Sequence, residues 1–201
     1  MGEATGTRNR RPGPGSILLS RMAQLNFGGP SGQTQTVFRL RGFFSMIIRD
    51  YQENDAAALR RCVVVLQDAE RAIDPLLLPG ETMADRYCRR IHERCREAAG
   101  RVYVAEDGFA VVGFVTILAR EPFVELDDPP GHYALISDLV VLDSHRGRGI
   151  GRQLLERAEA YAKQAGATEL RIGVLTNNRP ARRLYLDVGF QRHLEVLTKR
   201  W

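Results

Sequence analysis

Residues 135–152 constrain the fold of this chain more than any other stretch. An apolar, β-branched run, Leu135–Leu142, is followed by a loop that contains Gly147, Gly149 and Gly151 alternating with arginines, and then by an amphipathic run. This order predicts a strand, a tight loop and a helix. The fold must therefore place a glycine-rich loop at the N-terminal end of a helix, directly after a strand.

The three glycines predict backbone with positive φ, and they leave room for a ligand where a Cβ would otherwise stand. A helix N-terminus carries N–H groups without intrahelical acceptors and the positive end of the helix dipole, so such a loop suits a phosphate group. Arg146, Arg148 and Arg152 add positive charge. The alternative is a basic turn that only connects two elements, and the glycines alone do not separate these two interpretations.

Two well-known phosphate-binding patterns do not fit the loop. The dinucleotide pattern G-x-G-x-x-G fails in both registers, because Arg152 or Leu154 stands where its last glycine is required. A Walker loop requires a Gly-Lys pair, and the chain contains none. A phosphate site in this loop must follow another pattern.

Composition and charge limit the classes of partner. With 201 residues, 44% of them hydrophobic, the chain suits one globular domain with a tail. The net charge of +5 resides in residues 1–45, which hold six arginines and one acid, so the rest of the chain is balanced. We therefore predict no nucleic-acid partner. The longest apolar run, Ala110–Ala119, is too short to cross a bilayer, so no membrane partner is predicted.

Residues 1–45 contain eight of the 19 glycines and show no sustained periodicity, which predicts a disordered basic leader before a functional domain at residues 46–201. The apolar piece Ile17–Leu19 is too short for a signal-peptide core, which argues against secretion. The leader is then either an organellar transit peptide or incidental upstream sequence, and the glycine and proline content favours the second.

The cysteines and histidines indicate neither disulfides nor a metal. The three cysteines are odd in number and form no C-x-x-C pair, which predicts reduced thiols in a cytoplasmic protein. The four histidines are scattered, with no spacing typical of metal ligands. We therefore expect no metal site.

Periodicity and turn residues outline the other elements. Asn54 is the predicted cap of the first helix, and Gly166 is predicted to end the helix after the glycine-rich loop. The acidic, proline-rich residues 121–132 are either a solvated loop or a rim that attracts a cationic substrate. The predicted strands are 46–49, 101–105, 110–118, 135–142, 169–175 and 193–198, and the predicted helices are 55–67, 81–99, 150–165 and one that opens at Asn178.

A second motif follows the loop by one helix and one strand. The loop reads R-x-x-G-x-G at 146–151, and residues 178–190 read N-x-x-A-x-x-L-Y-x-x-x-G-F. Asn178 and Tyr185 share a helix face about 10 Å apart and can line an elongated ligand. Together, and in this order, the two motifs resemble those of the GCN5-related N-acetyltransferases (GNAT), with the resemblance covering roughly residues 46–201.

The resemblance implies an α/β (α+β) fold with a mixed, mostly antiparallel sheet, helices on both faces and a central pair of parallel strands that splay apart. It implies acetyl-CoA as cosubstrate, without a metal. The pantetheine arm would pair with the backbone of Leu139, Val140 and Val141 and contact Asn178. The residues implied for the pyrophosphate are Arg146, Gly147, Arg148, Gly149, Ile150, Gly151 and Arg152.

The activity that the resemblance implies is transfer of an acetyl group from acetyl-CoA to a primary amine, by direct attack in a ternary complex. Tyr185 would act as general acid toward the departing thiolate. The amine must first lose a proton. Asp138 is the only acid in 135–142 and is the candidate base, although Ser137 stands where many relatives carry glutamate.

Several functional questions stay open at this point. The alternative function is a catalytically silent sensor or regulatory module that binds acyl-CoA. The acceptor is a small amine, an amino acid, an antibiotic or a protein N-terminus, and the sequence does not select among these. A homodimer is compatible with the sequence and is not specified by it.

Overall fold

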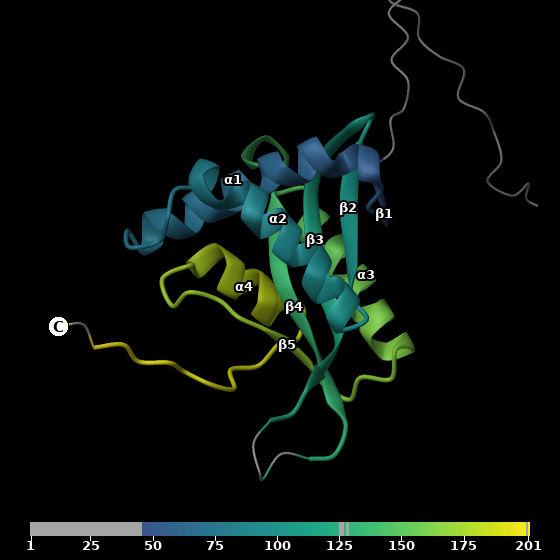
Figure 1. Cartoon of the computed structure of the whole chain (residues 1–201), viewed down its shortest axis with the longest axis vertical. Helices are drawn as coiled ribbons and strands as arrows, with labels where there is room; N and C mark the ends of the chain where they lie inside the picture. The colour runs from purple at the N-terminus through teal and green to yellow at the C-terminus, as the bar shows by residue number, and fades with distance from the viewer. Residues whose placement is uncertain (1–45, 125–126, 128, 200) are drawn as a thin grey trace, which may run out of the picture. The chain divides into compact units, whose positions relative to one another are not determined.

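The computed structural model describes residues 46–124, 127, 129–199 and 201, and the predicted leader, residues 1–45, lies outside them. The described residues form one five-stranded sheet with helices packed on it (Figure 1). In chain order the elements are β1 (Ile47–Asp50), a 3-10 turn (Glu53–Asp55), α1 (Ala56–Ile73), α2 (Gly80–Glu97), β2 (Arg101–Asp107), β3 (Ala110–Pro122), β4 (His132–Val141), a second 3-10 turn (Asp143–His145), α3 (Ile150–Gln164), β5 (Leu170–Ile172) and α4 (Arg179–Asp187).

The sheet order is β1-β2-β3-β4-β5. The first four strands are antiparallel neighbours, and β4 pairs with β5 in parallel. This confirms the mixed, mostly antiparallel sheet. The parallel pair is short, because only Ala134–Ile136 of β4 face Leu170–Ile172 of β5, and β4 then continues to Val141 without β5. The two strands therefore separate, and they do so at the edge of the sheet rather than at its centre.

The helices cover both faces of the sheet and create two cores. On one face, Leu59, Cys62 and Val63 of α1 pack with α2 and the sheet. On the other face, buried residues of α3 such as Leu154 and Ala158 pack against β2, β3 and β4. In Figure 1 α1 and α2 lie in front of the sheet and α3 lies behind it. Within the described residues, none of the helices is both long and apolar enough to span a bilayer.

A β-bulge in β4 changes which core its side chains enter. Thr116 of β3 pairs with Asp138, but the next residue, Ile117, pairs with Ile136, so Ser137 is an extra residue in β4. Before the bulge, Ile136 packs in the α3 core, and after it Val140 packs in the α1–α2 core. The bulge therefore turns Asp138 toward α1 and α2.

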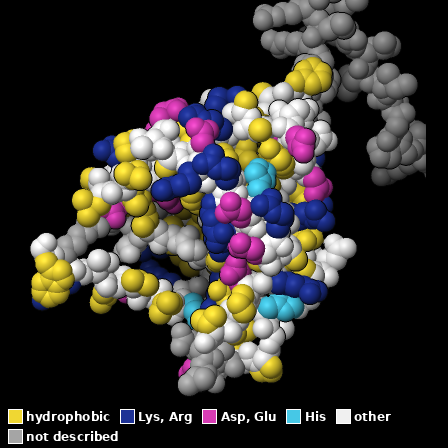
Figure 2. All heavy atoms as spheres, in the orientation of Figure 1, with side chains coloured by type: hydrophobic (Ala, Val, Ile, Leu, Met, Phe, Trp, Pro, Cys, Tyr) yellow, Lys and Arg dark blue, Asp and Glu magenta, His cyan; other side chains and the backbone are white. Residues whose placement is uncertain are grey.

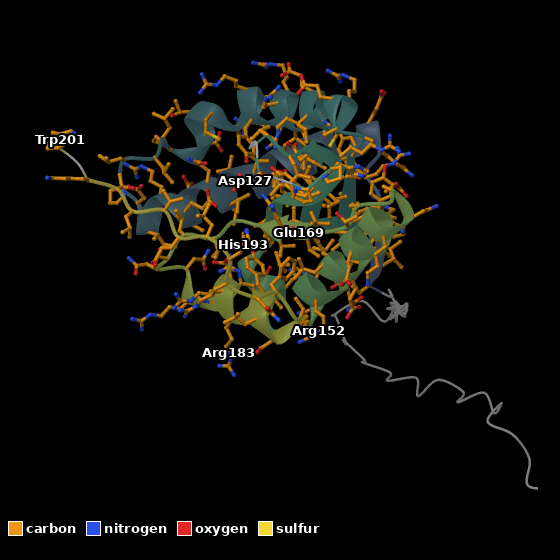
Figure 3. All side chains as sticks on the ribbon, turned by 90° about the horizontal axis from the view of Figure 1, so that it is seen from below. Asp127, Arg152, Glu169, Arg183, His193 and Trp201 are labelled. Atoms are coloured by element: carbon orange, nitrogen blue, oxygen red, sulfur yellow. The ribbon has the colours of Figure 1, made fainter. Side chains whose placement is uncertain are left out.

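Three predictions of local structure need correction. The strand predicted at 193–198 is wrong, because these residues have no strand partner and Leu194, Val196 and Leu197 are exposed. Apolar residues form a strand only where a neighbouring strand accepts their hydrogen bonds. The chain here leads away from the body toward Trp201 (Figure 3). Asn54 does not cap α1, because the 3-10 turn precedes the helix, and β5 is shorter than predicted.

Candidate active site

The open side of β4 is the first part of the candidate site. Leu142 N donates to Val112 O of β3 at 2.8 Å. Because peptide groups alternate in direction along a strand, those of Leu139 and Val141 point away from β3, to the side that β5 has left. The resemblance predicts that pantetheine pairs with this edge. In this structure the Val141 carbonyl accepts a hydrogen bond from Arg146 Nε at 3.0 Å.

The glycine-rich loop has the geometry of an anion site. Gly147 and Gly149 both have a φ of 77°, and a Cβ added at either would meet no atom within 4 Å. Gly149 is the N-cap of α3, and the first helical bond runs from Gln153 N to Gly149 O at 3.2 Å. The amides of the three residues between them precede that bond, so they have no acceptor within the helix. Amides of this kind at a helix N-terminus suit a phosphate group.

Gly151 differs from the other two glycines. It lies in the first turn of α3, and its φ is not positive, which corrects the prediction. A Cβ at this position would stand 3.0 Å from Leu184 Cδ2 of α4. Gly151 therefore allows the close approach of α3 to Leu184 of α4, and a larger residue there would require the Leu184 side chain to shift.

The loop arginines contact protein groups at the rim of the site. Besides binding the Val141 carbonyl, Arg146 pairs with Asp143 at 2.8 Å. Arg148 lies 3.3 Å from Asp107 in the β2–β3 turn. Arg152 reaches the carbonyl of Asp187 at the end of α4 at 3.5 Å, and Figure 3 shows it at the periphery of the molecule. All three arginines are exposed.

The second motif forms α4 and its cap. Asn178 is the N-cap, and its Oδ1 accepts a hydrogen bond from Ala181 N at 3.2 Å. Tyr185 is 8% exposed and packs edge-on against Phe190, with 6.0 Å between the ring centroids. Its hydroxyl has no hydrogen-bond partner among the described residues. Burial, with a contribution from the negative charge of Glu70, raises the pKa of Tyr185 to about 12, so the phenol keeps its proton at neutral pH.

Asp138 is buried beneath α2, with 4% of its surface exposed. Its Oδ1 accepts a 2.5 Å hydrogen bond from the Tyr87 hydroxyl, and its Oδ2 accepts one from the Ser137 hydroxyl at 2.7 Å. Burial and the neighbouring Asp138 charge raise the pKa of Tyr87, so Tyr87 is a donor at neutral pH. Both oxygens of Asp138 are thus engaged by hydroxyl groups.

Glu70 of α1 joins this group, and sequence reasoning missed it. Burial raises the pKa of Glu70, and the charge of Asp138 adds to the effect. Glu70 also acts electrostatically on Tyr87 and Tyr185. Titratable side chains from α1, α2, β4 and α4 are thus electrostatically linked, and Tyr87 and Asp138 are also joined by a hydrogen bond. The spacing of Glu70 from Val63 and Leu66 places it on the apolar stripe of α1, a signal that could have identified it.

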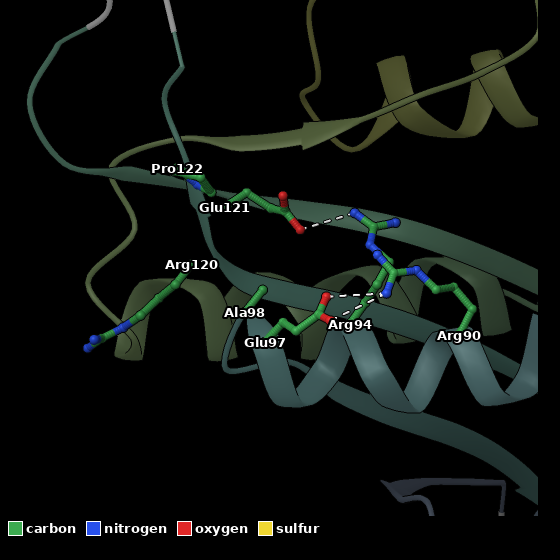
Figure 4. Close-up of a pocket in the computed structure, with 7 residues that line it drawn as sticks. All are labelled: Arg90, Arg94, Glu97, Ala98, Arg120, Glu121 and Pro122. Carbon is green, nitrogen blue, oxygen red and sulfur yellow. Dashed lines mark hydrogen bonds and ion pairs between the residues drawn. The ribbon is translucent and has the colours of Figure 1, made fainter.

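Two adjoining cavities run along the flank of α2. The first, of 340 Å³, is lined by Met83, Arg86, Tyr87, Arg89, Arg90 and Glu93, and the second, of 540 Å³, by Arg90, Arg94, Glu97, Ala98, Arg120, Glu121 and Pro122. In Figure 4 Arg94 reaches from α2 to Glu121 of β3, a 3.0 Å pair, while Arg90 pairs with Glu97 along α2. Basic and acidic side chains alternate over this face (Figure 2). Tyr87 connects the groove to Asp138.

The described residues contain free cysteines and no cluster of metal ligands. Cys62, Cys88 and Cys95 are free thiols, and burial raises the pKa of Cys62 and of Cys95 to about 11. Among the described residues, no three His, Cys, Asp or Glu side chains cluster in a way that would hold a metal.

Comparison with known proteins gives consistent matches. The sequence profile of the Acetyltransferase (GNAT) family matches residues 66–190. N-acetyltransferase 8F1 of Rattus norvegicus is 35% identical over 96 residues, which is 47% of this chain and 41% of that protein. The uncharacterized N-acetyltransferase YycN of Bacillus subtilis is 32% identical over 90 residues, 45% of this chain and 54% of that protein. The matches thus span about half of these relatives or less.

Solved structures share the fold. The structure of the aminoglycoside N-acetyltransferase AAC(6')-Iy in complex with CoA superimposes with a TM-score of 0.59 at 18% identity. The match covers 82% of this chain and 99% of that one. At this identity the likeness supports the fold, and the residues that match the two motifs must carry any argument about the site.

Proposed function

The chain belongs to the acetyltransferase (GNAT) family, and we propose that it transfers an acetyl group from acetyl-CoA to a primary amine. The observation that carries this proposal is the anion site at the start of α3, where Gly149 has a φ of 77° and the next amides have no helical acceptor. It lies beside the edge where β5 leaves β4. The aminoglycoside N-acetyltransferase whose fold is similar was solved with CoA bound, which agrees with this ligand.

Acetyl-CoA fits the residues that surround this edge. In our proposal the amides at the start of α3 bind its pyrophosphate, with the loop arginines adding charge. The backbone of Leu139 and Val141 pairs with pantetheine, which requires Arg146 to release the Val141 carbonyl. Asn178 keeps Oδ1 on its cap bond and offers its amide nitrogen to the same arm. When bound, acetyl-CoA supplies the activated acetyl group.

Tyr185 is the proposed general acid. Its phenol is buried, keeps its proton at neutral pH and has no competing acceptor among the described residues. It therefore has a proton to give to the sulfur as the thiolate leaves. Asp138 stays in the proposed catalytic group as a buried negative charge behind Tyr87, a residue that lines one of the cavities. Each of its oxygens already accepts one hydrogen bond, from the Tyr87 hydroxyl or from the Ser137 hydroxyl.

Thiol release from acetyl-CoA with a panel of primary amines tests the proposal. The panel includes small amines, amino acids, an aminoglycoside and peptides with a free N-terminus. Release that depends on one of these amines, with a mass increase of one acetyl group on the amine, supports the enzyme. CoA binding by calorimetry without release for any amine favours the silent acyl-CoA sensor instead.

We also propose a cytoplasmic location, because the three cysteines of the chain are free thiols and two of them lie on one face of α2. A monomer or a homodimer is compatible with this proposal. Sedimentation of the purified full chain determines which of them forms.

A further inference from the structure

Glu70 lies on the inward stripe of α1, where a carboxylate is unusual. Leu59 and Val63 of this stripe are buried against the sheet, and Leu66 is partly buried beside them. Glu70 follows Leu66 by four positions, and Ile73 follows Glu70 by three, so all lie along one side of the helix. Glu70 is half-buried in the C-terminal part of this stripe, and the charge of Asp138 acts on it.

The two carboxylates of the site differ in how they are bound. Asp138 accepts a hydrogen bond at each oxygen, from Tyr87 and from Ser137. Glu70 makes neither a hydrogen bond nor an ion pair through its side chain with any described residue. A half-buried carboxylate without a donor or a cation is costly, and such groups cluster at functional sites. Of the two carboxylates, Glu70 is therefore the one whose oxygens accept no hydrogen bond from a described residue.

Titratable groups from three other elements interact with Glu70. Asp138 comes from β4, Tyr87 from α2 and Tyr185 from α4, and each interacts electrostatically with Glu70. Arg94 of α2 is the cation that acts on Tyr87. Burial is the larger cause that raises the pKa of Glu70, and the charge of Asp138 is the smaller one. A higher pKa brings the proton affinity of Glu70 closer to that of the acceptor amine.

A buried hydroxyl beside Asp138 also indicates that a polar ligand group or a water enters here. Thr116 lies opposite Asp138 in the β3–β4 ladder and is fully buried. Its hydroxyl has no hydrogen-bond partner among the described residues. Buried hydroxyl groups seldom stay in that state. The side of β4 that faces α1 and α2 is therefore built to receive a polar group.

We propose that Glu70 is the general base that removes the proton from the acceptor ammonium, directly or through one water. This assignment rests on the proposed acetyl transfer and adds a residue to it. The ammonium gives one proton to the Glu70 carboxylate, the nitrogen–carbon bond forms, and the carbon–sulfur bond breaks. The sulfur takes the Tyr185 proton, the acetylated nitrogen returns its surplus proton to Tyr185, and Glu70 releases its proton to solvent.

The Glu70→Gln variant tests this assignment, with Glu156→Gln as the matched control. Glu156 lies on the exposed face of α3, so replacing its carboxylate with the glutamine amide should leave the rate unchanged. For the fastest amine of the panel, Glu70→Gln should lower kcat about 100-fold at pH 7, the scale of a lost general base. The CoA affinity should be unchanged. Above the pKa of the amine, about 10 for a lysine side chain, much of the rate should return because the amine is already neutral.

Infrared titration supplies a readout that needs no substrate. The wild-type protein should show one carboxyl that protonates above the ordinary range of glutamate, and Glu70→Gln should lack it. A variant that keeps the wild-type rate and pH profile overturns the assignment. So does an equal rate loss at every pH together with a lower melting temperature, which indicates a structural role. If the wild type releases no thiol with any amine, the proposed acetyl transfer itself fails.

Discussion

The Tyr87 hydroxyl donates a 2.5 Å hydrogen bond to Asp138 Oδ1, and this bond joins α2 to the bulged part of β4. Without the bulge, Asp138 would face the α3 core and would not reach Tyr87 of α2. The bond therefore depends on a one-residue irregularity in the strand. It also fixes the helix that lines the groove relative to the strand that borders the open edge.

The first prediction follows from that bond. Tyr87→Phe keeps the ring but leaves Asp138 buried with one donor fewer, which should lower the free energy of unfolding by about 1–3 kcal/mol. Chemical denaturation measures the loss. Tyr161→Phe is the control, because the Tyr161 hydroxyl donates to the Ala99 carbonyl in a more exposed setting and should cost less. Equal losses for the two variants would contradict the special role of the buried pair.

The second prediction separates binding from chemistry at Tyr185. Tyr185→Phe preserves the packing against Phe190 and removes only the proton donor. CoA affinity should change little, and kcat should fall by about 100-fold. The CoA thiol has an ordinary pKa of about 8.5, so the thiolate needs an acid less at high pH and the defect should be largest at low pH. Steady-state rates from pH 6 to 10 measure this, and an unchanged kcat would remove Tyr185 from the mechanism.

The third prediction concerns the anion site. Gly149→Val forces a β-branched residue into a φ of 77° and fills the open space above the amides, so CoA affinity should fall by about 100-fold or more. Arg146→Ala should weaken binding less, because the site consists mainly of backbone donors. Calorimetry with CoA gives both values. Normal affinity in a folded Gly149→Val protein would show that the phosphate lies elsewhere.

The fourth prediction is a pH dependence of stability at Asp55, which lies far from the proposed chemistry. Hydrogen bonds from Arg49, at 2.7 and 2.9 Å, hold the pKa of this buried carboxyl below its ordinary value. A carboxyl with a lowered pKa stabilises the fold above its unfolded pKa, and this contribution is lost as the pH falls through its folded pKa. Asp55→Asn should therefore destabilise at pH 7 by about 1–3 kcal/mol and by less near pH 3.

Melting curves at the two pH values test this prediction. Glu159→Gln is the control, because its ion pair with Lys163 is exposed and should contribute less than about 0.5 kcal/mol at either pH. A penalty at Asp55 that does not change with pH would mean that the carboxylate charge is not what stabilises the turn.

The sequence predicted the parts of the fold in which local pattern and chain order decide the outcome. The strand, loop and helix around Gly149, and the cap at Asn178, depend on residues close together in the chain, and the structure has them where the pattern indicates. The hairpin around Gly108 is similar, because its turn residues specify the connection. These elements needed no knowledge of distant partners.

The features that escaped prediction all depend on distant partners. The strand expected at 193–198 has the right alternation but no neighbour to pair with. The bulge at Ser137 arises from the register with β3, although two polar residues in an apolar strand hinted at it. The electrostatic interaction of Glu70 with Asp138 joins residues of α1 and β4 that are distant in the sequence. Gly151 likewise serves a contact with Leu184 that spacing alone does not show.

The short pairing of β5 also affects the order in which the strands assemble and the ease with which β5 unfolds locally. β2, β3 and β4 form a meander of sequential neighbours, which closes small loops, whereas β5 reaches β4 only after the crossover through α3. With three residue pairs to hold it, β5 should assemble late and exchange its amide protons early. Among the five strands, β5, which borders the proposed acetyl-CoA site, is thus expected to have the lowest opening free energy. Slower hydrogen exchange at Leu170–Ile172 is the expected signature of CoA binding.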